Sequence, residues 1–180
     1  DWCVSRQRVW GVPLPIFINK KTNKILVDDE VFENIAKIYE KEGSDCWFSD
    51  DPQKFLGKKY KAENFEKLSD IVEVWFDSGS THSFVLEKRK DLKWPASMYL
   101  EGSDQHRGWF HSSLLESCGT RDRAPFESIL SHGFVVDGKG LKMSKSLGNV
   151  IAPEDILKKY GADILRIWVA SSNYAEDLRI

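Results

Sequence analysis

The apolar residues of this chain recur at two spacings, and these spacings predict where helices and short strands lie. Val31, Ile35 and Ile38 follow one another at intervals of four and three residues, which places them on one face of a helix. Acidic residues at 28–30 precede the run, and Gly43 follows it. Because acidic side chains favour a helix start and glycine a helix end, we expect a helix that stops at Gly43.

The rest of the first third of the chain carries weaker patterns. Two short apolar runs, 14–18 and 24–27, flank the turn-forming sequence Lys20-Lys21-Thr22-Asn23, which predicts a β-hairpin. The segment 44–69 is charged and irregular, and only a short helix at 52–56 is indicated within it. We expect this segment to be a surface insertion and not part of a core.

From residue 71 onward, strand and helix patterns alternate. Strands are predicted at 71–76, 97–101 and 129–136, and helices at 105–117, 154–160 and 162–172. The first of these strands ends in a small-residue turn, Asp77-Ser78-Gly79-Ser80. The alternation predicts an α/β fold with a Rossmann-like parallel sheet, which binds ligands beyond the carboxyl ends of its strands. We divide the chain into a connective α+β segment, 1–70, and the Rossmann-like part, 71–180.

Composition narrows the range of functions. The net charge is -2 and 30% of the residues are charged, with both signs mixed, so bulk charge predicts no general nucleic-acid surface. The 3 cysteines form no C-x-x-C pair, which favours a reducing cytoplasm over a disulfide framework. No apolar run is long enough to span a membrane. Because the chain starts at Asp1 without an initiator Met and ends at Ile180, we expect it to be a piece of a longer protein.

The most informative motif is Lys142-Met143-Ser144-Lys145-Ser146, which lies between glycines. Lysine and serine between glycines also describe an ordinary solvated turn. However, this motif lies between a predicted strand and a predicted helix that has proline in its first turn. Two ammonium groups on a mobile loop in that place can stabilise charge on a departing polyphosphate, as nucleotidyl transfer requires. We therefore select Lys142 and Lys145 as candidate catalytic residues.

Residues that could hold a nucleotide lie at the ends of two predicted strands. Gly102 and Asp104 stand at a strand-to-helix junction, where backbone amides favour anions and a carboxylate can accept hydrogen bonds from ribose hydroxyls. The alternative, that Ser103 or Asp104 only caps the helix, has equal weight. His132, which Gly133 follows, either faces the nucleotide or is an ordinary strand histidine, and residue type does not separate the two.

Aromatic and basic residues give further candidates. Trp75 and Trp109 are selected as walls of a pocket because both lie close in sequence to the expected crevice, although core packing is the usual role of tryptophan. Arg6, Arg8 and Trp10 interleave cations with an aromatic ring, which suits contact with single-stranded RNA. Salt bridges to surface acids are the alternative. No pattern of histidine and cysteine predicts a metal site.

Four blocks of sequence, in this order, resemble one enzyme family. They are Asp1-Trp2-Cys3-Val4-Ser5-Arg6-Gln7-Arg8-Val9-Trp10-Gly11, Val74-Trp75-Phe76-Asp77-Ser78-Gly79-Ser80, Glu101-Gly102-Ser103-Asp104-Gln105-His106-Arg107-Gly108-Trp109-Phe110, and the Lys142-Met143-Ser144-Lys145-Ser146 (KMSKS) motif. The chain resembles the class I aminoacyl-tRNA synthetases of the isoleucyl, valyl and leucyl group. The second and third blocks are similar to the isoleucyl type, and the resemblance spans nearly the whole chain except 19–69.

The resemblance implies a role for each motif residue. Those expected to bind ATP or the adenylate are Glu101, Gly102, Asp104, Gln105, His132, Gly133, Val135, Met143 and Lys145, with Lys142 and Lys145 as the catalytic pair. Trp75 and Trp109 would flank the isoleucine side chain. The implied partners are ATP with Mg²⁺, isoleucine and tRNA(Ile), in a monomeric cytoplasmic enzyme that binds no membrane.

The chain also departs from the family pattern. The family's second ATP motif, His-Ile-Gly-His, is absent, so the resemblance implies that the chain is the second half of the catalytic domain and inactive alone. Some relatives bind zinc through a cysteine pair near 16–25, but this segment has no cysteine, and no zinc is expected. A valyl or leucyl enzyme and a non-catalytic tRNA-binding module are the alternatives. The module would be expected to lack the lysines and acids that this chain retains.

Overall fold

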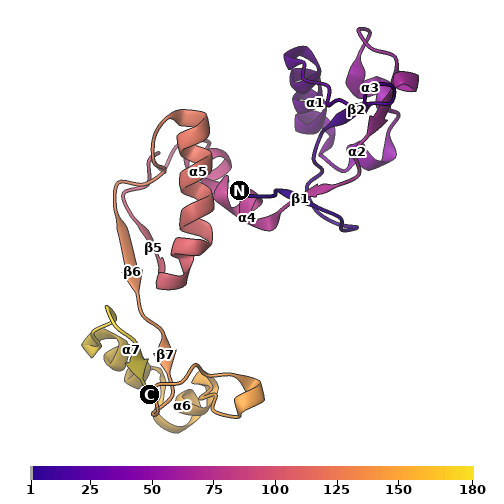
Figure 1. Ribbon diagram of the computed structural model, residues 1–180. Helices are drawn as coiled ribbons and strands as arrows, with labels where there is room; N and C mark the ends of the chain where they lie inside the picture. Colours follow the sequence, from indigo (N-terminus) through magenta and orange to yellow (C-terminus); the bar gives the residue numbers. More distant parts are fainter. Residues whose placement is uncertain (1) are drawn as a thin grey trace. The chain divides into compact units, whose positions relative to one another are not determined.

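The computed structural model describes residues 2–180, so Asp1, the first residue of the N-terminal sequence block, lies outside it. The chain divides into two compact units, Asp1–Ser78 and Gly79–Ile180, which are described separately below. The sequence pattern predicts this division after residue 70. Figure 1 shows the first unit in indigo to magenta and the second in magenta to yellow.

The first unit contains the long helix that the apolar spacing predicts. Helix α1 spans Asp29–Glu42, and Val31 and Ile35 on one face are buried. The Asp28 carboxylate caps its start by accepting hydrogen bonds from the amides of Glu30 (3.1 Å) and Val31 (3.4 Å). Gly43 ends the helix with φ of 83°, a conformation that favours glycine, and its amide donates to the Tyr39 carbonyl. The prediction of this helix and its end is confirmed.

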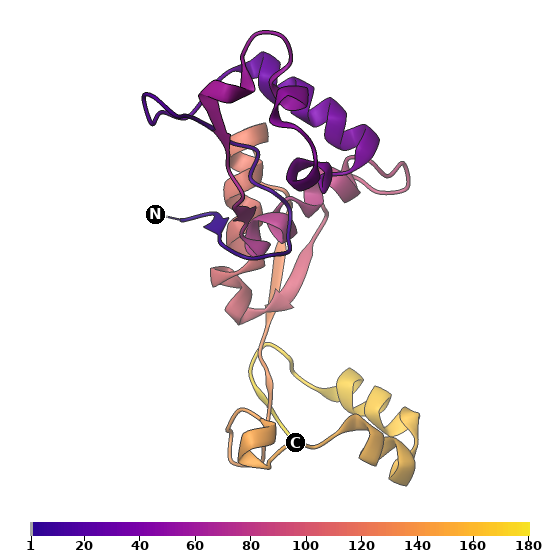
Figure 2. The ribbon, with the colours of Figure 1, turned by 90° about the vertical axis from the view of Figure 1, so that its right-hand side faces the viewer.

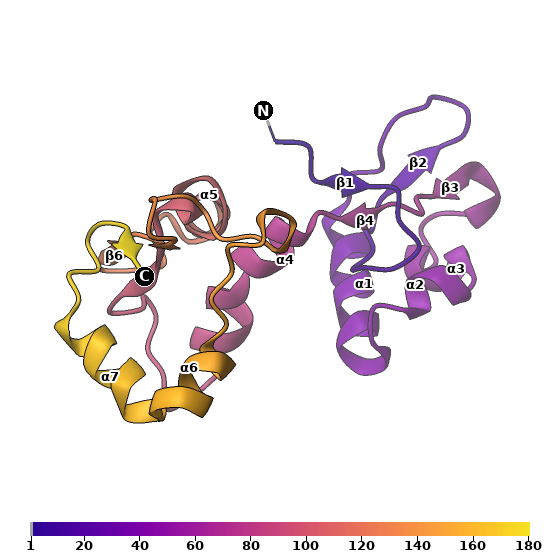
Figure 3. The same ribbon diagram turned by 90° about the horizontal axis from the view of Figure 1, so that it is seen from below.

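Two antiparallel strand pairs complete the backbone of the first unit. Strand β1 (Ser5–Arg6) pairs with β4 (Ile71–Val72), and β2 (Phe17–Asn19) pairs with β3 (Phe65–Lys67). The predicted hairpin is present as a single antiparallel bridge between Ile18 and Ile25. The main partner of β2 is therefore β3, which lies more than 40 residues later in the chain. Helices α1, α2 (Cys46–Ser49) and α3 (Pro52–Leu56) lie on one side of these strands (Figure 3).

The expectation that 44–69 forms only a surface insertion is wrong. Trp47 and Phe55, both 0% exposed, lie in this segment and form the centre of the core of the first unit. The Trp47 ring lies 4.9 Å from that of Phe55 and 5.1 Å from that of Phe17, and its Nε1 donates to the Leu68 carbonyl (2.7 Å). The few apolar residues of the segment are separated by charges, so no period appears in the sequence. The short helices α2 and α3 nevertheless bury them.

The predicted strand 71–76 is also corrected. Strand β4 ends at Val72, and helix α4 (Val74–Gly79) follows. Glu73 starts this helix, since its carboxylate accepts a hydrogen bond from the Trp75 amide (3.0 Å) and its carbonyl accepts one from Phe76 (2.9 Å). This local cap overrides the strand preference of the β-branched and aromatic residues around it.

The second unit contains two crossovers between parallel strands. Strand β5 (Tyr99–Gly102) pairs in parallel with β6 (Ile129–His132), and α5 (Trp109–Arg121) lies between them in sequence. Strand β7 (Val135–Val136) pairs in parallel with β8 (Leu178–Arg179), with α6 (Pro153–Tyr160) and α7 (Ala162–Ser171) between them in sequence. Figure 2 shows α6 and α7 in orange to yellow as consecutive helices. The prediction of a parallel α/β arrangement is confirmed, in the form of two-stranded sheets within residues 2–180.

Glycine interrupts the predicted strand 129–136 and divides it into β6 and β7. The Gly133 amide donates to the Tyr174 carbonyl (2.9 Å). A Cβ atom at Gly133 would lie 2.3 Å from the backbone carbon of Glu176, so only glycine permits this close approach. The chain after α7 therefore packs directly against the link between the two strands. Within residues 2–180, no helix combines the length and the apolar character needed to cross a membrane.

Candidate functional site

A cavity of about 600 Å³ in the second unit brings four predicted site residues together. Asp104 comes from the 3₁₀ turn after β5, and Val135 comes from β7. Lys142 and Met143 come from the loop that carries the KMSKS motif, which is called the lysine loop below. The full lining consists of Asp104, Phe134, Val135, Val136, Gly140, Lys142, Met143 and Asp177. One cavity thus combines two carboxylates, an ammonium group and apolar surface, a mixture that suits a nucleotide.

The carboxylate side of the cavity is built by the junction after β5. Gly102 is the N-cap of the 3₁₀ turn Ser103–Arg107, and no side chain caps this turn, so the alternative that Ser103 or Asp104 acts as a cap is not found. Asp104 Oδ2 accepts a hydrogen bond from Nε2 of the Gln105 side chain (3.2 Å). The Gln105 side-chain oxygen accepts one from the Trp109 amide (2.9 Å), which ties the junction to the first residue of α5.

The absence of a side chain at Gly102 leaves room for the groups that line the cavity. A Cβ atom there would lie 2.9 Å from Asp104 Oδ1 and 3.2 Å from the Phe134 ring. Glu101, the residue before Gly102 in β5, is exposed and is not among the lining residues.

The lysine loop continues the antiparallel turn that follows β7. Lys142 forms a bridge with Val136, and the Asp137 amide donates to the Leu141 carbonyl (2.9 Å). Gly140 has φ of 79° within this turn. The backbone at Lys142 is thus paired with strand β7, and the Lys142 side chain lines the cavity.

Lys145 lies in a different part of the same loop. It begins a 3₁₀ turn, Lys145–Leu147, whose N-cap Ser144 accepts a hydrogen bond from the Leu147 amide (3.2 Å) and whose C-cap Gly148 has φ of 64°. The Lys145 side chain is exposed and does not line the cavity. The two lysines that the sequence treats as a pair therefore occupy different positions.

His132 and Gly133 lie beside the cavity, and neither belongs to its lining. His132 is the last residue of β6, and its Nδ1 lies 2.8 Å from the Gly133 carbonyl oxygen. This contact satisfies one ring nitrogen locally, as the strand-histidine alternative expects. Phe134, the next residue, does line the cavity.

The two tryptophans selected as pocket walls belong to different units. Trp109 stacks on Tyr99 with ring centroids 4.2 Å apart and an interplanar angle of 12°, so its ring packs against β5. Trp75, on α4 in the first unit, is 42% exposed. Their pairing around an amino-acid side chain stays a prediction.

The N-terminal basic residues have distinct surroundings. Arg6 donates to the Cys3 carbonyl (2.7 Å) and lies 4.0 Å from the Glu73 carboxylate, which agrees with the salt-bridge alternative. Arg8 lines a second cavity of about 490 Å³ in the first unit, together with Gln7, Val9, Phe48, Ser69 and Asp70. Trp10 is 87% exposed. Arg8 and Trp10 thus remain accessible for an RNA contact, whereas Arg6 is engaged by its own unit.

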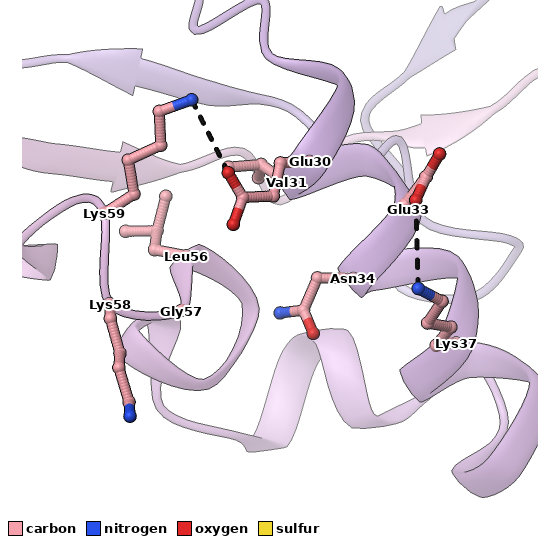
Figure 4. Close-up of a pocket in the computed structure, with 9 residues that line it drawn as sticks. All are labelled: Glu30, Val31, Glu33, Asn34, Lys37, Leu56, Gly57, Lys58 and Lys59. Carbon is pink, nitrogen blue, oxygen red and sulfur yellow. Dashed lines mark ion pairs between the residues drawn. The ribbon is translucent and has the colours of Figure 1, made fainter.

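A third cavity, of about 240 Å³, separates α1 from the end of α3 (Figure 4). Four of its charged residues form two ion pairs, Lys59 with Glu30 (3.7 Å) and Lys37 with Glu33 (3.8 Å). Asn34 donates to the Phe55 carbonyl (2.8 Å) and so joins the two helices. These contacts describe a crevice that holds helices together and carries no candidate chemistry.

The electrostatics of the first unit centre on Asp28. Its carboxylate lies 2.6 Å from Lys59 Nζ and accepts a hydrogen bond from the Tyr60 hydroxyl (2.7 Å). These two contacts, Lys59 first, lower the pKa of Asp28 to about 2.

No cluster of three or more histidine, cysteine or acidic side chains suited to a metal ion occurs in the described part of the chain. The expectation that the chain binds no zinc stays a prediction.

Sequence reasoning missed several residues of the lysine-loop site. Phe134, Gly140 and Asp177 line the cavity, and Asp137 and Asn149 hold the loop. Asp177 follows the last helix by several residues, and no sequence pattern connects it to the loop. Asp137 and Asn149 flank the lysine motif at each end, which is a signal that the spacing of polar residues could have supplied.

The family model described as tRNA synthetases class I (I, L, M and V) matches residues 1–180. The chain is 88% identical over 180 residues to an isoleucine-tRNA ligase of Pelagibacter ubique and 58% identical over 185 residues to one of Caldicellulosiruptor saccharolyticus. Each alignment covers 100% of this chain and 20% of the relative. A crystal structure titled as the ternary complex of Agrobacterium radiobacter K84 agnB2 LeuRS-tRNA-LeuAMS has a TM-score of 0.65 at 24% identity, covering 99% of this chain and 25% of that one.

These comparisons correct one expectation. The chain spans about a fifth of the length of the curated relatives, and the family model matches it from end to end. Such coverage does not support the assignment of the chain to the second half of a catalytic domain, and this assignment is withdrawn. The structural neighbour shows the fold alone, that of a class I synthetase domain with parallel strand pairs.

Proposed function

The chain belongs to the class I tRNA synthetases of the I, L, M and V group, and we propose that it is part of an isoleucine-tRNA ligase. The complete enzyme activates isoleucine with ATP and transfers it to tRNA(Ile) in the cytoplasm. The observation that carries the proposal is the cavity in which Asp104, Lys142 and Met143 meet. The 88% identity to an isoleucine-tRNA ligase favours isoleucine over valine or leucine as the substrate.

The cavity is suited to an adenylate. Its volume of about 600 Å³ lies within the usual range for small-molecule sites. Ribose hydroxyls can donate hydrogen bonds to the Asp104 carboxylate, the base can pack on Val135 and Met143, and phosphate oxygens can face the Lys142 ammonium group. Each part of the nucleotide then meets a group of matching chemistry.

In the activation step, a carboxylate oxygen of isoleucine attacks the α-phosphorus of ATP, which enters as substrate with its magnesium ion. A bond forms between this oxygen and phosphorus, the bond to the bridging oxygen breaks, and pyrophosphate leaves. Lys142 and Lys145 stabilise the negative charge that grows on the departing oxygens. Lys145 reaches these oxygens through a movement of its 3₁₀ turn. The terminal ribose of tRNA(Ile) then attacks the adenylate carbonyl and releases AMP.

The remaining predicted residues take supporting roles in this proposal. Trp109 contacts the isoleucine side chain, and Arg8 and Trp10 contact tRNA. The chain contains no His-Ile-Gly-His sequence, so the 180 residues by themselves are expected not to catalyse activation. Asp104, Lys142 and Lys145 are all present, which weighs against a non-catalytic tRNA-binding module.

The test is ATP-pyrophosphate exchange by the full-length protein, with isoleucine, valine and leucine supplied separately. We expect exchange to depend on an added amino acid and to be most efficient with isoleucine. Higher efficiency with valine or leucine would replace the substrate assignment. No exchange with any of the three, by a protein that is folded and binds tRNA, would favour the non-catalytic module.

A further inference from the structure

Asn149 lies just after the lysine motif, and its side chain is the meeting point of three hydrogen bonds. Its Nδ2 donates to Asp137 Oδ2 (2.8 Å) and to the Lys142 carbonyl (3.2 Å). Its Oδ1 accepts from the Ser144 amide (2.9 Å). Both amide protons and the carbonyl oxygen of this half-buried side chain are therefore used.

Asp137 holds the other side of this arrangement at the end of β7. One carboxylate oxygen accepts hydrogen bonds from the amides of Lys139 (2.9 Å) and Leu141 (2.8 Å). The other oxygen accepts the bond from Asn149 (2.8 Å). The Asn149 bond, and after it the bond from the Leu141 amide, lower the pKa of Asp137.

These bonds divide the lysine loop into two parts. The Lys142 carbonyl and the Ser144 amide lie on either side of Met143, and both bond to Asn149. The backbone 142–144 is thus fastened to β7 through Asp137. The hydrogen bonds of the 3₁₀ turn Lys145–Leu147 involve Ser144 and Gly148 at its ends, whereas those of the Asp137 and Asn149 side chains go to residues outside the turn.

We propose that Asn149 and Asp137 act together as positioning residues, a latch that fixes Lys142 and Met143 at the nucleotide cavity and leaves the turn carrying Lys145 free to move. The proposal rests on the proposed function, because the cavity is taken to bind ATP. Lys142 then supplies a fixed charge to the bound nucleotide. Lys145 supplies a charge that arrives with the transition state.

Variants that swap the side chains of Asp137 and Asn149 test the latch. Asn149→Ala removes all three bonds, and Asn149→Asp places a second carboxylate against Asp137. Asp137→Asn places two amide groups face to face. In the double variant Asp137→Asn/Asn149→Asp, the new amide at position 137 can donate to the new carboxylate at position 149, which restores one bond between the side chains with reversed direction.

The first readout is the kinetics of isoleucine-dependent exchange by the full-length protein. Each single variant is expected to lower kcat/KM for ATP about 10- to 100-fold, with the KM for isoleucine changed less than about twofold. In the double variant, kcat/KM for ATP should be at least about fivefold higher than in the less active single variant. It should stay below that of the unmodified protein, because the bond to the Lys142 carbonyl is lost. Asn173→Ala, which removes an exposed asparagine outside the loop, is the control and should match the unmodified protein.

The second readout does not depend on activity. Hydrogen exchange at the Ser144 amide should be faster in Asn149→Ala than in the unmodified protein and slow again in the double variant, with no change in global unfolding. The latch would be overturned if the single variants kept the kcat/KM for ATP of the unmodified protein. It would also be overturned if kcat/KM for ATP in the double variant were no higher than in either single variant. If the unmodified protein shows no ATP-pyrophosphate exchange at all, the proposed function fails. Hydrogen exchange at the Ser144 amide then decides by itself whether Asn149 holds the loop.

Discussion

The core around Trp47 and the region around the lysine loop are built by opposite means. The first unit buries Phe17, Trp47 and Phe55 to within 2% exposure, and the Trp47 ring packs against the other two rings. Helices α6 and α7, which follow the loop, contain no buried residue. The loop itself is held by hydrogen bonds of Asp137, Ser144 and Asn149.

This difference suits the work of each region. Close packing of apolar side chains gives a single rigid arrangement, because any displacement opens a cavity. The 3₁₀ turn Lys145–Leu147 is exposed, and its hydrogen bonds involve Ser144 and Gly148 at its own ends and not the Asp137–Asn149 network, so it can change conformation at small cost. The residues that must follow a changing substrate are therefore found where burial is least.

The largest effect is expected from the centre of the aromatic core. Trp47→Ala should lower the free energy of unfolding of the 180-residue chain by about 3–5 kcal/mol, because it leaves a cavity and removes a hydrogen bond to Leu68. Urea denaturation followed by circular dichroism measures this change. Trp10→Ala, at an 87% exposed site, is the control with little expected effect. A loss below about 1 kcal/mol for Trp47→Ala would contradict the assignment of the core.

In the loop, the largest effect is expected on catalysis and not on stability. Lys145→Ala in the full-length protein should lower kcat for isoleucine-dependent exchange about 100-fold or more, with the KM for isoleucine within about threefold, since the contact forms in the transition state. Lys139→Ala changes an exposed lysine of the preceding turn and should retain activity. An unchanged rate for Lys145→Ala would remove this lysine from the mechanism.

A smaller effect is expected at the carboxylate wall of the cavity. Asp104→Asn should raise the KM for ATP about tenfold or more, because one charged acceptor of ribose hydrogen bonds becomes neutral. Asp122→Asn is a matched control, since residue 122 adopts a left-handed conformation (φ 54°) that asparagine also accepts. Equal KM values for ATP in the two variants would exclude Asp104 from the nucleotide site.

The stability of the first unit should respond to acid through Asp28. The pKa of Asp28 is lowered to about 2 in the folded chain, so its contribution to stability is complete above its unfolded pKa of about 4 and is lost as the pH falls toward 2. Asp28→Asn should therefore flatten the loss of stability between about pH 4 and pH 2. Asp29→Asn, which changes the neighbouring exposed carboxylate, is the control. A profile for Asp28→Asn identical to that of the unmodified chain would contradict the ion pair with Lys59.

The smallest effect is expected where the apolar surface is uncovered. Ile167→Gln on α7, at a 63% exposed site, should change the free energy of unfolding of the 180-residue chain by less than about 0.5 kcal/mol. The same substitution at Ile35, which is 2% exposed on α1, should cost about 2 kcal/mol or more. Similar losses at the two positions would show that α7 is packed as well as α1.

Much of the fold could be predicted because its helices and strands leave patterns in adjacent residues of the sequence. The helix from Asp29 has an acidic cap, a 3.6-residue period and a terminal glycine. The parallel pairs follow from the alternation of strands and helices. The core around Trp47 could not be predicted, because its members come from short helices without a period, and β3 pairs with a strand far away in sequence.

The candidate site was predictable to the extent that it depends on residue type. Residue type selected Asp104 and Lys142, the family resemblance added Val135 and Met143, and all four line one cavity. What the sequence could not supply is their division into roles, since Lys142 and Lys145 belong to the same motif. That division depends on hydrogen bonds from Asn149, which are made in three dimensions.

The central claim is that the lysine loop and Asp104 form the ATP site, and labelling of lysine side chains tests it most directly. The full-length protein is acylated with and without ATP, magnesium and isoleucinol, an unreactive analogue of isoleucine, and the modified lysines are identified by mass spectrometry. We expect ATP to protect Lys142 strongly and Lys145 partly, and to leave Lys139 unchanged. Equal labelling of Lys142 in the presence and absence of saturating ATP would contradict the account.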